Sequence, residues 1–157
     1  MLKLQTSLLG IVFLCAFVEG AVIPALWTPL RVDLVLGMVL GAVVHLGFGQ
    51  GLLFVMLSSM LLQSFTSARP GLLPLFYLVF FVAIDMLKEV IYLENPLTQA
   101  LFVSGFSVMG TACFFLVQGV VPQGFEVVSM LAGCLLTGCA GPVMVGFMGR
   151  LKKVYGT

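Results

Sequence analysis

Residues Leu97–Val117 read LTQALFVSGFSVMGTACFFLV and contain no charged side chain. Residues Phe125–Met148 follow after a short break and contain Glu126 as their single charged residue. A helix rises about 1.5 Å per residue, so about 20 mostly apolar residues cross the ~30 Å hydrocarbon core of a bilayer. Both stretches reach that length, and they predict two membrane-spanning helices.

Four more apolar runs precede this pair. They are Leu8–Leu26, Leu34–Leu46, Leu52–Phe65 and Leu72–Leu87. Stretches such as Ile11–Phe17 are apolar on every side, whereas the strands of a membrane barrel alternate in polarity. The sequence therefore predicts an all-α integral membrane protein, a compact bundle of about six transmembrane helices. The gaps are too short for an extramembrane domain, so residues 1–157 are expected to form a single transmembrane helical domain.

The segment from Val32 to Phe65 leaves five crossings as the alternative to six. It must hold two crossings that turn at Gly47, Gly49 and Gly51, and each is shorter than an ideal span. Two short helices inside the bundle give six crossings, whereas one long tilted helix gives five.

The composition excludes several classes of protein. The chain is 61% hydrophobic and 8% charged, far from the soluble average of about 25% charged residues. A formal net charge of +1 leaves no basic face for phosphates, which excludes an electrostatic nucleic-acid partner. The basic tail Arg150, Lys152 and Lys153 reads as a flank that holds the last helix at an anionic leaflet.

The sequence contains no motif for catalysis, metal binding or cofactor binding. Its four cysteines lie inside apolar runs without a CxxC pair or a histidine at ligand spacing, so they read as small buried hydrophobes. Walker, Rossmann, nucleophile-elbow and zincin patterns are missing from the sequence as well. We therefore expect a protein that is not an enzyme and holds neither metal nor cofactor.

The first run resembles a signal peptide in part. Lys3 precedes an apolar stretch that ends at the small residues Gly20 and Ala21. Apolar sequence nevertheless continues to Trp27, which suits an interfacial anchor, and this favours a retained first helix.

The distribution of basic residues predicts the orientation. With six crossings, one side receives Lys3, Lys88, Arg150, Lys152 and Lys153, and the other receives Arg31 and Arg69. Since cytoplasmic flanks carry the excess of Lys and Arg, both termini are expected in the cytoplasm.

Small and polar residues recur at four-residue spacing on three runs, which places them on one helix face. The last run has Ser129, Gly133, Thr137 and Gly141, the second has Asp33, Gly37, Gly41, His45 and Gly49, and the fifth has Ser104, Ser107, Thr111 and Gln118. Such faces suit helix packing within the bundle, docking of a partner helix, or the lining of a solute path.

Glu19 is the one carboxylate well inside an apolar run. A charge near mid-bilayer costs about 2.5–3.5 kcal/mol on insertion scales, so we expect protonation or a partner such as His45 or Gln63. Exposure at the outer interface is the third possibility. His45 by itself reads as a satisfied polar group near a helix end.

Charged residues gather after the fourth run. Asp85, Lys88 and Glu89 have three- and four-residue spacing, which predicts an interfacial charge cluster rather than a proton relay. Asn95 precedes Pro96 and is the expected cap of the fifth helix.

One stretch of the chain resembles a known family. It comprises Leu34–Gly41, the glycine-rich turn Gly47–Gly51, the third run through Gln63, and Gly71-Leu72 before a new helix. This layout resembles the rod shape-determining MreD family, which also has a proline near the first outer loop, matched here by Pro24 or Pro29, and a short basic ending. The family usually has an acid eight residues before the glycine, where this chain has Gln63.

The resemblance implies a non-enzymatic subunit of the bacterial elongation machinery in the inner membrane. Such a subunit binds MreC, a single-pass membrane protein, and helps to couple MreB to the glycosyltransferase RodA and its transpeptidase partner. It supports lateral peptidoglycan synthesis and cell shape. The alternative is the substrate-binding subunit of an energy-coupling-factor vitamin transporter, which would line a solute pocket with groups such as Glu19, Ser104, Ser107 and Gln118.

Overall fold

The computed structural model describes residues 2–22, 32–66, 70–119 and 124–155. Within these residues the chain forms six α-helices and one π-helical turn, and no strand. The elements are α1 (Leu2–Phe17), the π turn η1 (Val18–Val22), α3 (Leu34–His45), α4 (Phe48–Ser64), α5 (Leu72–Leu87), α6 (Pro96–Gln118) and α7 (Phe125–Tyr155). The predicted all-helical fold is confirmed for this part of the chain.

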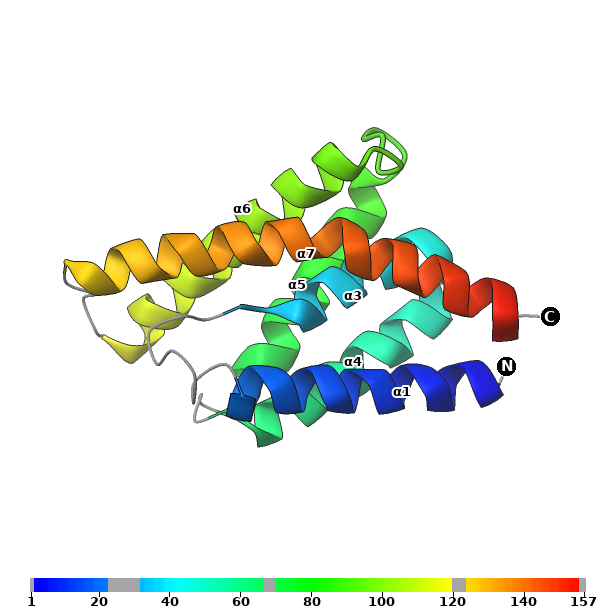
Figure 1. Cartoon of the computed structure of the whole chain (residues 1–157), viewed down its shortest axis with the longest axis horizontal. Helices are drawn as coiled ribbons and strands as arrows, with labels where there is room; N and C mark the ends of the chain where they lie inside the picture. Colours follow the sequence, from blue (N-terminus) through cyan, green and yellow to red (C-terminus); the bar gives the residue numbers. More distant parts are fainter. Residues whose placement is uncertain (1, 23–31, 67–69, 120–123, 156–157) are drawn as a thin grey trace.

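Successive helices run in alternating directions (Figure 1). The start of α1 and the end of α7 therefore lie at the same end of the molecule, which we call the terminal end. The α3–α4 connection and the α5–α6 turn lie at this end too, whereas α3, α5 and α7 begin toward the other end. Lys88, which follows α5, and Lys152 and Lys153, in the last turn of α7, belong to elements at the terminal end. Arg31 and Arg69 lie outside the described residues.

The core forms around the short central helix α3. Every residue from Val35 to Val43 is buried, and α3 packs mainly against α7. Aromatic side chains of α5 complete the core, with Tyr77, Phe80 and Phe81 almost fully buried. This burial makes α3 the interior helix of the described structure.

Local sequence sets several helix ends. Gly71 precedes α5 with φ +85°, a left-handed conformation that glycine adopts without steric cost. Gly119 ends α6 in the same way with φ +67°. Asn95 caps α6 as predicted, because its side chain accepts a hydrogen bond of 2.9 Å from the Leu97 amide.

Asn95→Ala tests this cap. The substitution removes the acceptor for the Leu97 amide at an exposed helix start, so we expect a loss of about 1 kcal/mol in the free energy of unfolding. The measurement is equilibrium unfolding of the detergent-solubilised protein. Asn95→Asp, which retains an acceptor oxygen, should unfold within ~0.5 kcal/mol of the parent protein; equal losses for both variants would contradict the assignment.

The described helices follow the apolar runs, but α1 begins before Leu8, α7 continues past Met148 to Tyr155, and two segments differ in kind. The glycine-rich segment predicted as a turn is mostly helical, because α4 begins at Phe48 and includes Gly49 and Gly51. A Cβ at Gly51 would lie 2.7 Å from the Phe81 ring, so this glycine permits close packing inside a helix. The first run forms α1 and then the π turn η1; its predicted end at residues 23–26, with Pro24, lies outside the described residues, as do Trp27 and Pro29.

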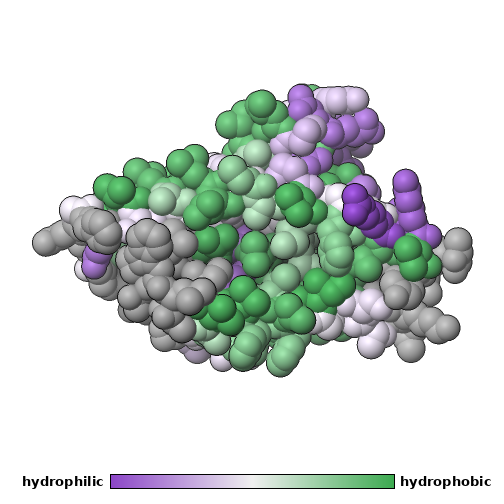
Figure 2. All heavy atoms as spheres, in the orientation of Figure 1, coloured by the Kyte–Doolittle hydropathy of each residue, from purple (hydrophilic) through white to green (hydrophobic). Residues whose placement is uncertain are grey.

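Two of the described helices are long and apolar enough to cross a membrane, over Pro96–Val117 and Glu126–Val154. The other apolar helices are shorter. Figure 2 shows hydrophobic residues over much of the visible surface and hydrophilic residues gathered near the α5–α6 turn and the end of α7. Exposed apolar side chains include Leu75, Leu101, Leu116 and Leu135.

Candidate functional site

The predicted small-residue faces of α3 and α7 lie against each other. A Cβ at Gly37 would stand 3.2 Å from the Cα of Gly141, and one at Gly41 would stand 3.4 Å from the Cα of Val145. Glycine at these positions lets the two backbones approach closely. The small-residue faces of α3 and α7 therefore contact each other within this chain rather than a helix of a partner.

The predicted small-residue face of the last run lies on α7, which contacts both α3 and α6. Ser129, Gly133 and Thr137 are buried on α7. The next residue, Gly138, faces α6, where a Cβ would lie 2.9 Å from the carbonyl oxygen of Ala100. Ser104 lies at the same contact, so this predicted solute-path residue packs between helices.

Glu19 lies in the π turn η1 and reaches the start of α3. Its Oε1 accepts hydrogen bonds from the backbone amides of Leu34 and Val35, the latter at 2.9 Å. The predicted partner His45 lies at the opposite end of α3, and this part of the prediction is wrong. The predicted buried polar residue Gln63 lies in the last turn of α4 and is partly buried.

Asp33 provides the second carboxylate at the start of α3. Its Oδ1 accepts a hydrogen bond of 2.8 Å from the Leu36 amide, and its Oδ2 accepts one from the hydroxyl of Tyr77 on α5. Its own amide donates to Thr137 Oγ1 on α7 at 2.9 Å, and that hydroxyl donates to the Gly133 carbonyl. One residue thus joins α3, α5 and α7.

Glu19, Asp33, Tyr77 and Thr137 form a polar cluster at the start of α3. The position of this cluster in the bundle explains why carboxylates are needed there. Thr137 lies twelve residues into α7, so α3 begins about 18 Å along the neighbouring helix. The first amides of any helix lack partners within the helix. Two partly buried carboxylates supply acceptors for these amides, at the positive end of the helix dipole.

The sequence indicates only part of this cluster. Glu19 stands out because it interrupts an apolar run, and Asp33 and Thr137 share the four-residue spacing of small and polar residues on their helices, but Tyr77 has no such pattern. The missed signal is the position of Asp33 directly before an apolar run, where aspartate is a preferred helix cap. Tyr77 is 44 residues away and carries no local signal.

A second polar contact joins α3 and α7 at the terminal end. The His45 ring Nε2 lies 3.1 Å from the carbonyl oxygen of Val145, and Lys152 Nζ donates a 2.5 Å hydrogen bond to the backbone oxygen of His45. His45 is a satisfied polar group near a helix end, as predicted. A cation at a helix C-terminus also stabilises the helix dipole.

The α5–α6 turn carries the predicted charge cluster. Lys88 Nζ lies 2.6 Å from Asp85 Oδ1 in an ion pair, and Glu89 is exposed. Tyr92 donates a 3.0 Å hydrogen bond to Glu94 Oε2, and this bond raises the pKa of Tyr92. Three carboxylates against one ammonium group make the turn acidic.

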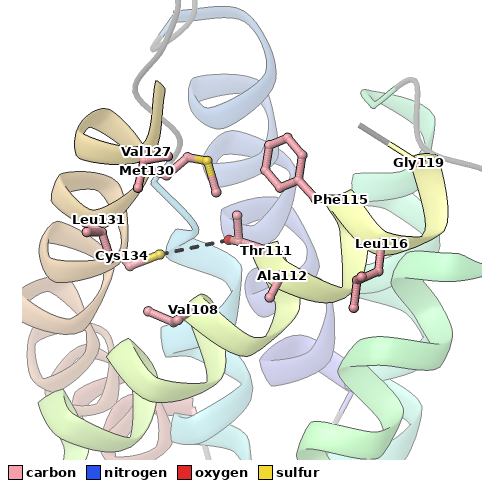
Figure 3. Close-up of a pocket in the computed structure, with 10 residues that line it drawn as sticks. All are labelled: Val108, Thr111, Ala112, Phe115, Leu116, Gly119, Val127, Met130, Leu131 and Cys134. Atoms are coloured by element: carbon pink, nitrogen blue, oxygen red, sulfur yellow. Dashed lines mark hydrogen bonds between the residues drawn. The ribbon is translucent and has the colours of Figure 1, made fainter. Parts of the chain in front are cut away.

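An apolar groove of about 540 Å³ lies between α6 and α7 (Figure 3). Phe115 and Leu116 of α6 and Met130 and Leu131 of α7 are among the side chains that line it. Its polar lining side chains are those of Thr111 and Cys134, whose Oγ1 and Sγ lie 3.9 Å apart, and Thr111 also donates to the Ser107 carbonyl. The groove therefore suits hydrocarbon better than a polar solute.

The predicted solute-lining residues do not share a pocket in the described part of the chain. Glu19 caps α3, Ser104 packs against Gly138, and neither they nor Ser107 line the α6–α7 groove. The side chain of Gln118 lies outside the described residues. These residues also contain no group of three or more His, Cys, Asp or Glu side chains placed to hold a metal ion.

No family model matches this chain, and neither a curated protein nor a solved structure matches it significantly.

Proposed function

We propose that this protein is a multi-pass subunit of the bacterial inner membrane, with six helices in the bilayer and both termini in the cytoplasm. The alternating helix directions support this topology, because they bring the two chain ends together. Lys88 at the end of α5, and Lys152 and Lys153 in the last turn of α7, belong to the elements at that same end, as expected for a cytoplasmic face. The shorter helices α3, α4 and α5 pack inside the bundle or against it, where full spanning length is not required.

We infer that its role is that of an MreD-type scaffold in the cell-elongation complex. It would dock an MreC-like protein and a RodA-like glycosyltransferase with its transpeptidase, and so connect MreB indirectly to lateral peptidoglycan synthesis. Support comes from the segment that carries the resemblance, where Gly71 adopts a backbone conformation that favours glycine and α5 begins at Leu72. The hairpin between α3 and α4 lies where the family has its second-to-third helix hairpin.

The main support for the scaffold role is that the buried polar groups form hydrogen bonds within the chain. Glu19, Asp33, Tyr77 and Thr137 bond to one another or to backbone groups of α3 and α7, so they hold helices together. The groove between α6 and α7 is apolar and open rather than an enclosed polar pocket. A subunit whose two interior carboxylates are hydrogen-bonded within the chain and whose outer helices are apolar is suited to binding other helices.

Affinity purification tests this role. We expect the tagged protein, extracted from native membranes with a mild detergent, to retain an MreC-like protein or the RodA–transpeptidase pair, identified by mass spectrometry. An unrelated six-helix membrane protein is the control. Recovery of ABC-type ATPases with a coupling protein instead would contradict the proposal and assign the chain to the vitamin transporters.

A further inference from the structure

One face of α6 is exposed along the whole helix. It consists of side chains spaced by three or four residues, and we call this set the α6 seam: Leu97, Leu101, Gly105, Val108, Ala112 and Leu116. Leu101 is 65% exposed and Leu116 is 81% exposed. The opposite face is covered, since Val103 packs on Gly141 and Phe106 packs on Phe80 of α5.

The α6 seam has the length and shape of a helix-binding surface. α6 contains 23 residues and is about 35 Å long, enough to cross the hydrocarbon core. Spacings of three and four residues are those of helices that pack side by side. Space around Gly105 is open, with no atom within 4 Å of the position of a Cβ, and a second helix backbone can approach there.

The seam runs into the apolar groove at one end. Val108, Ala112 and Leu116 belong to both, and Figure 3 shows their side chains on the turns of α6 that lead to Gly119. The groove offers no unsatisfied polar group, because its Thr111 hydroxyl already donates to the Ser107 carbonyl. An occupant of this end must present an apolar surface.

The other end of the seam meets the acidic α5–α6 turn. Lys88 pairs with Asp85, while Glu89 and Glu94 are exposed beside Val90 and Tyr92, which are 83% and 69% exposed. Cytoplasmic flanks of transmembrane helices carry an excess of Lys and Arg. The acidic α5–α6 turn, at the proposed cytoplasmic end of the bundle, is complementary in charge to such a flank.

We propose that the α6 seam, from the acidic turn to the apolar groove, binds one transmembrane helix of a partner whose cytoplasmic flank is basic. The inference rests on the proposed membrane topology and names the surface that would receive the MreC-like single-pass protein. Apolar side chains of the partner helix fill the seam and the groove, and Lys or Arg residues of its flank lie against Glu89 and Glu94.

Photo-crosslinking in membranes tests the seam. A photoreactive amino acid replaces Leu101, Val108 or Leu116 in cells that also produce the tagged MreC-like protein of the same organism. Matched exposed positions on α4, Leu53 and Met60, are the controls. We expect the adduct with the MreC-like protein at the three seam positions, at least about tenfold stronger than at the α4 positions. Equal labelling of both helices, adducts with a second copy only, or no protein adduct would overturn the inference.

Charge reversal tests the acidic turn. We expect Glu89→Lys with Glu94→Lys to reduce the retained MreC-like protein about fivefold, since exposed charge pairs are weak individually. Replacing the basic flank of the partner by glutamates should restore binding. Glu126→Lys, an exposed acid in the first turn of α7, is the matched control and should leave binding unchanged. Loss without restoration by the acidic flank would overturn this contact.

The two proposals fail in different ways. If the MreC-like protein is retained by the tagged chain but no seam position forms an adduct with it, the α6 seam is not the interface and the scaffold role stands. If it is not retained at all, the scaffold role itself fails.

Discussion

Gly138→Ala is expected to lower the free energy of unfolding by about 3 kcal/mol, because it forces α6 and α7 apart. A Cβ at this position would lie 1.7 Å from Ser104 Oγ and 2.9 Å from the backbone oxygen of Ala100. Rotation of the serine side chain relieves the first contact. The second involves backbone, so only a shift of the helices relieves it. Equilibrium unfolding in mixed micelles, followed by circular dichroism, measures the loss.

Gly146→Ala is the matched control on the same helix. No atom lies within 4 Å of its Cβ position, and alanine is the better helix former by up to ~1 kcal/mol. This variant should therefore be as stable as the parent protein or slightly more stable. If both variants unfold at the same denaturant concentration, α6 and α7 do not pack closely at Gly138, and the contact described here is incorrect.

A helix is predictable where its apolar run ends at residues with clear local preferences. The run Leu72–Leu87 coincides with α5, which begins after the left-handed Gly71 and ends before Lys88. The start of α4 was not predictable in the same way. A glycine that makes a turn and one that admits the Phe81 ring, as Gly51 does, look the same in a sequence.

The sequence predicts which helix faces pack closely, but it does not predict which helix each face contacts. Four-residue spacing identifies Gly37 and Gly141 as contact residues, and they do contact each other. Spacing says nothing about whether the neighbour belongs to the same chain, since the physical requirement of close approach is identical for both. The exposed seam on α6 has large residues in place of most small ones, so it did not stand out.

The polar cluster could not be predicted from its individual residues. A charge inside an apolar run predicts a partner for Glu19, but its partners are the backbone amides of Leu34 and Val35. Every residue except proline has a backbone amide, so such a partner leaves no trace in the sequence. Only the buried start of α3 makes these amides available.

Because three helices meet at Asp33, its removal is expected to cost more than the loss of an ordinary helix cap. In Asp33→Ala the Leu36 amide and the Tyr77 hydroxyl both lose their acceptor. A lost cap costs about 1 kcal/mol, and an unsatisfied buried donor adds about 1–3 kcal/mol. The sum is a destabilisation of about 3 kcal/mol, measured by the same unfolding experiment.

Two comparisons separate this buried role from a general effect of removing an acid. Asp85→Ala breaks an exposed ion pair and should cost less than ~1 kcal/mol. Tyr77→Phe retains the buried ring and removes only the hydroxyl, so a double-mutant cycle with Asp33→Ala isolates their hydrogen bond. We expect the double variant to be clearly less destabilised than the sum of the single variants, because either substitution alone already breaks this bond. Additive losses, or an Asp33→Ala loss no larger than that of Asp85→Ala, would mean that the carboxylate does not join α3 to α5 and that water or other groups serve the start of α3.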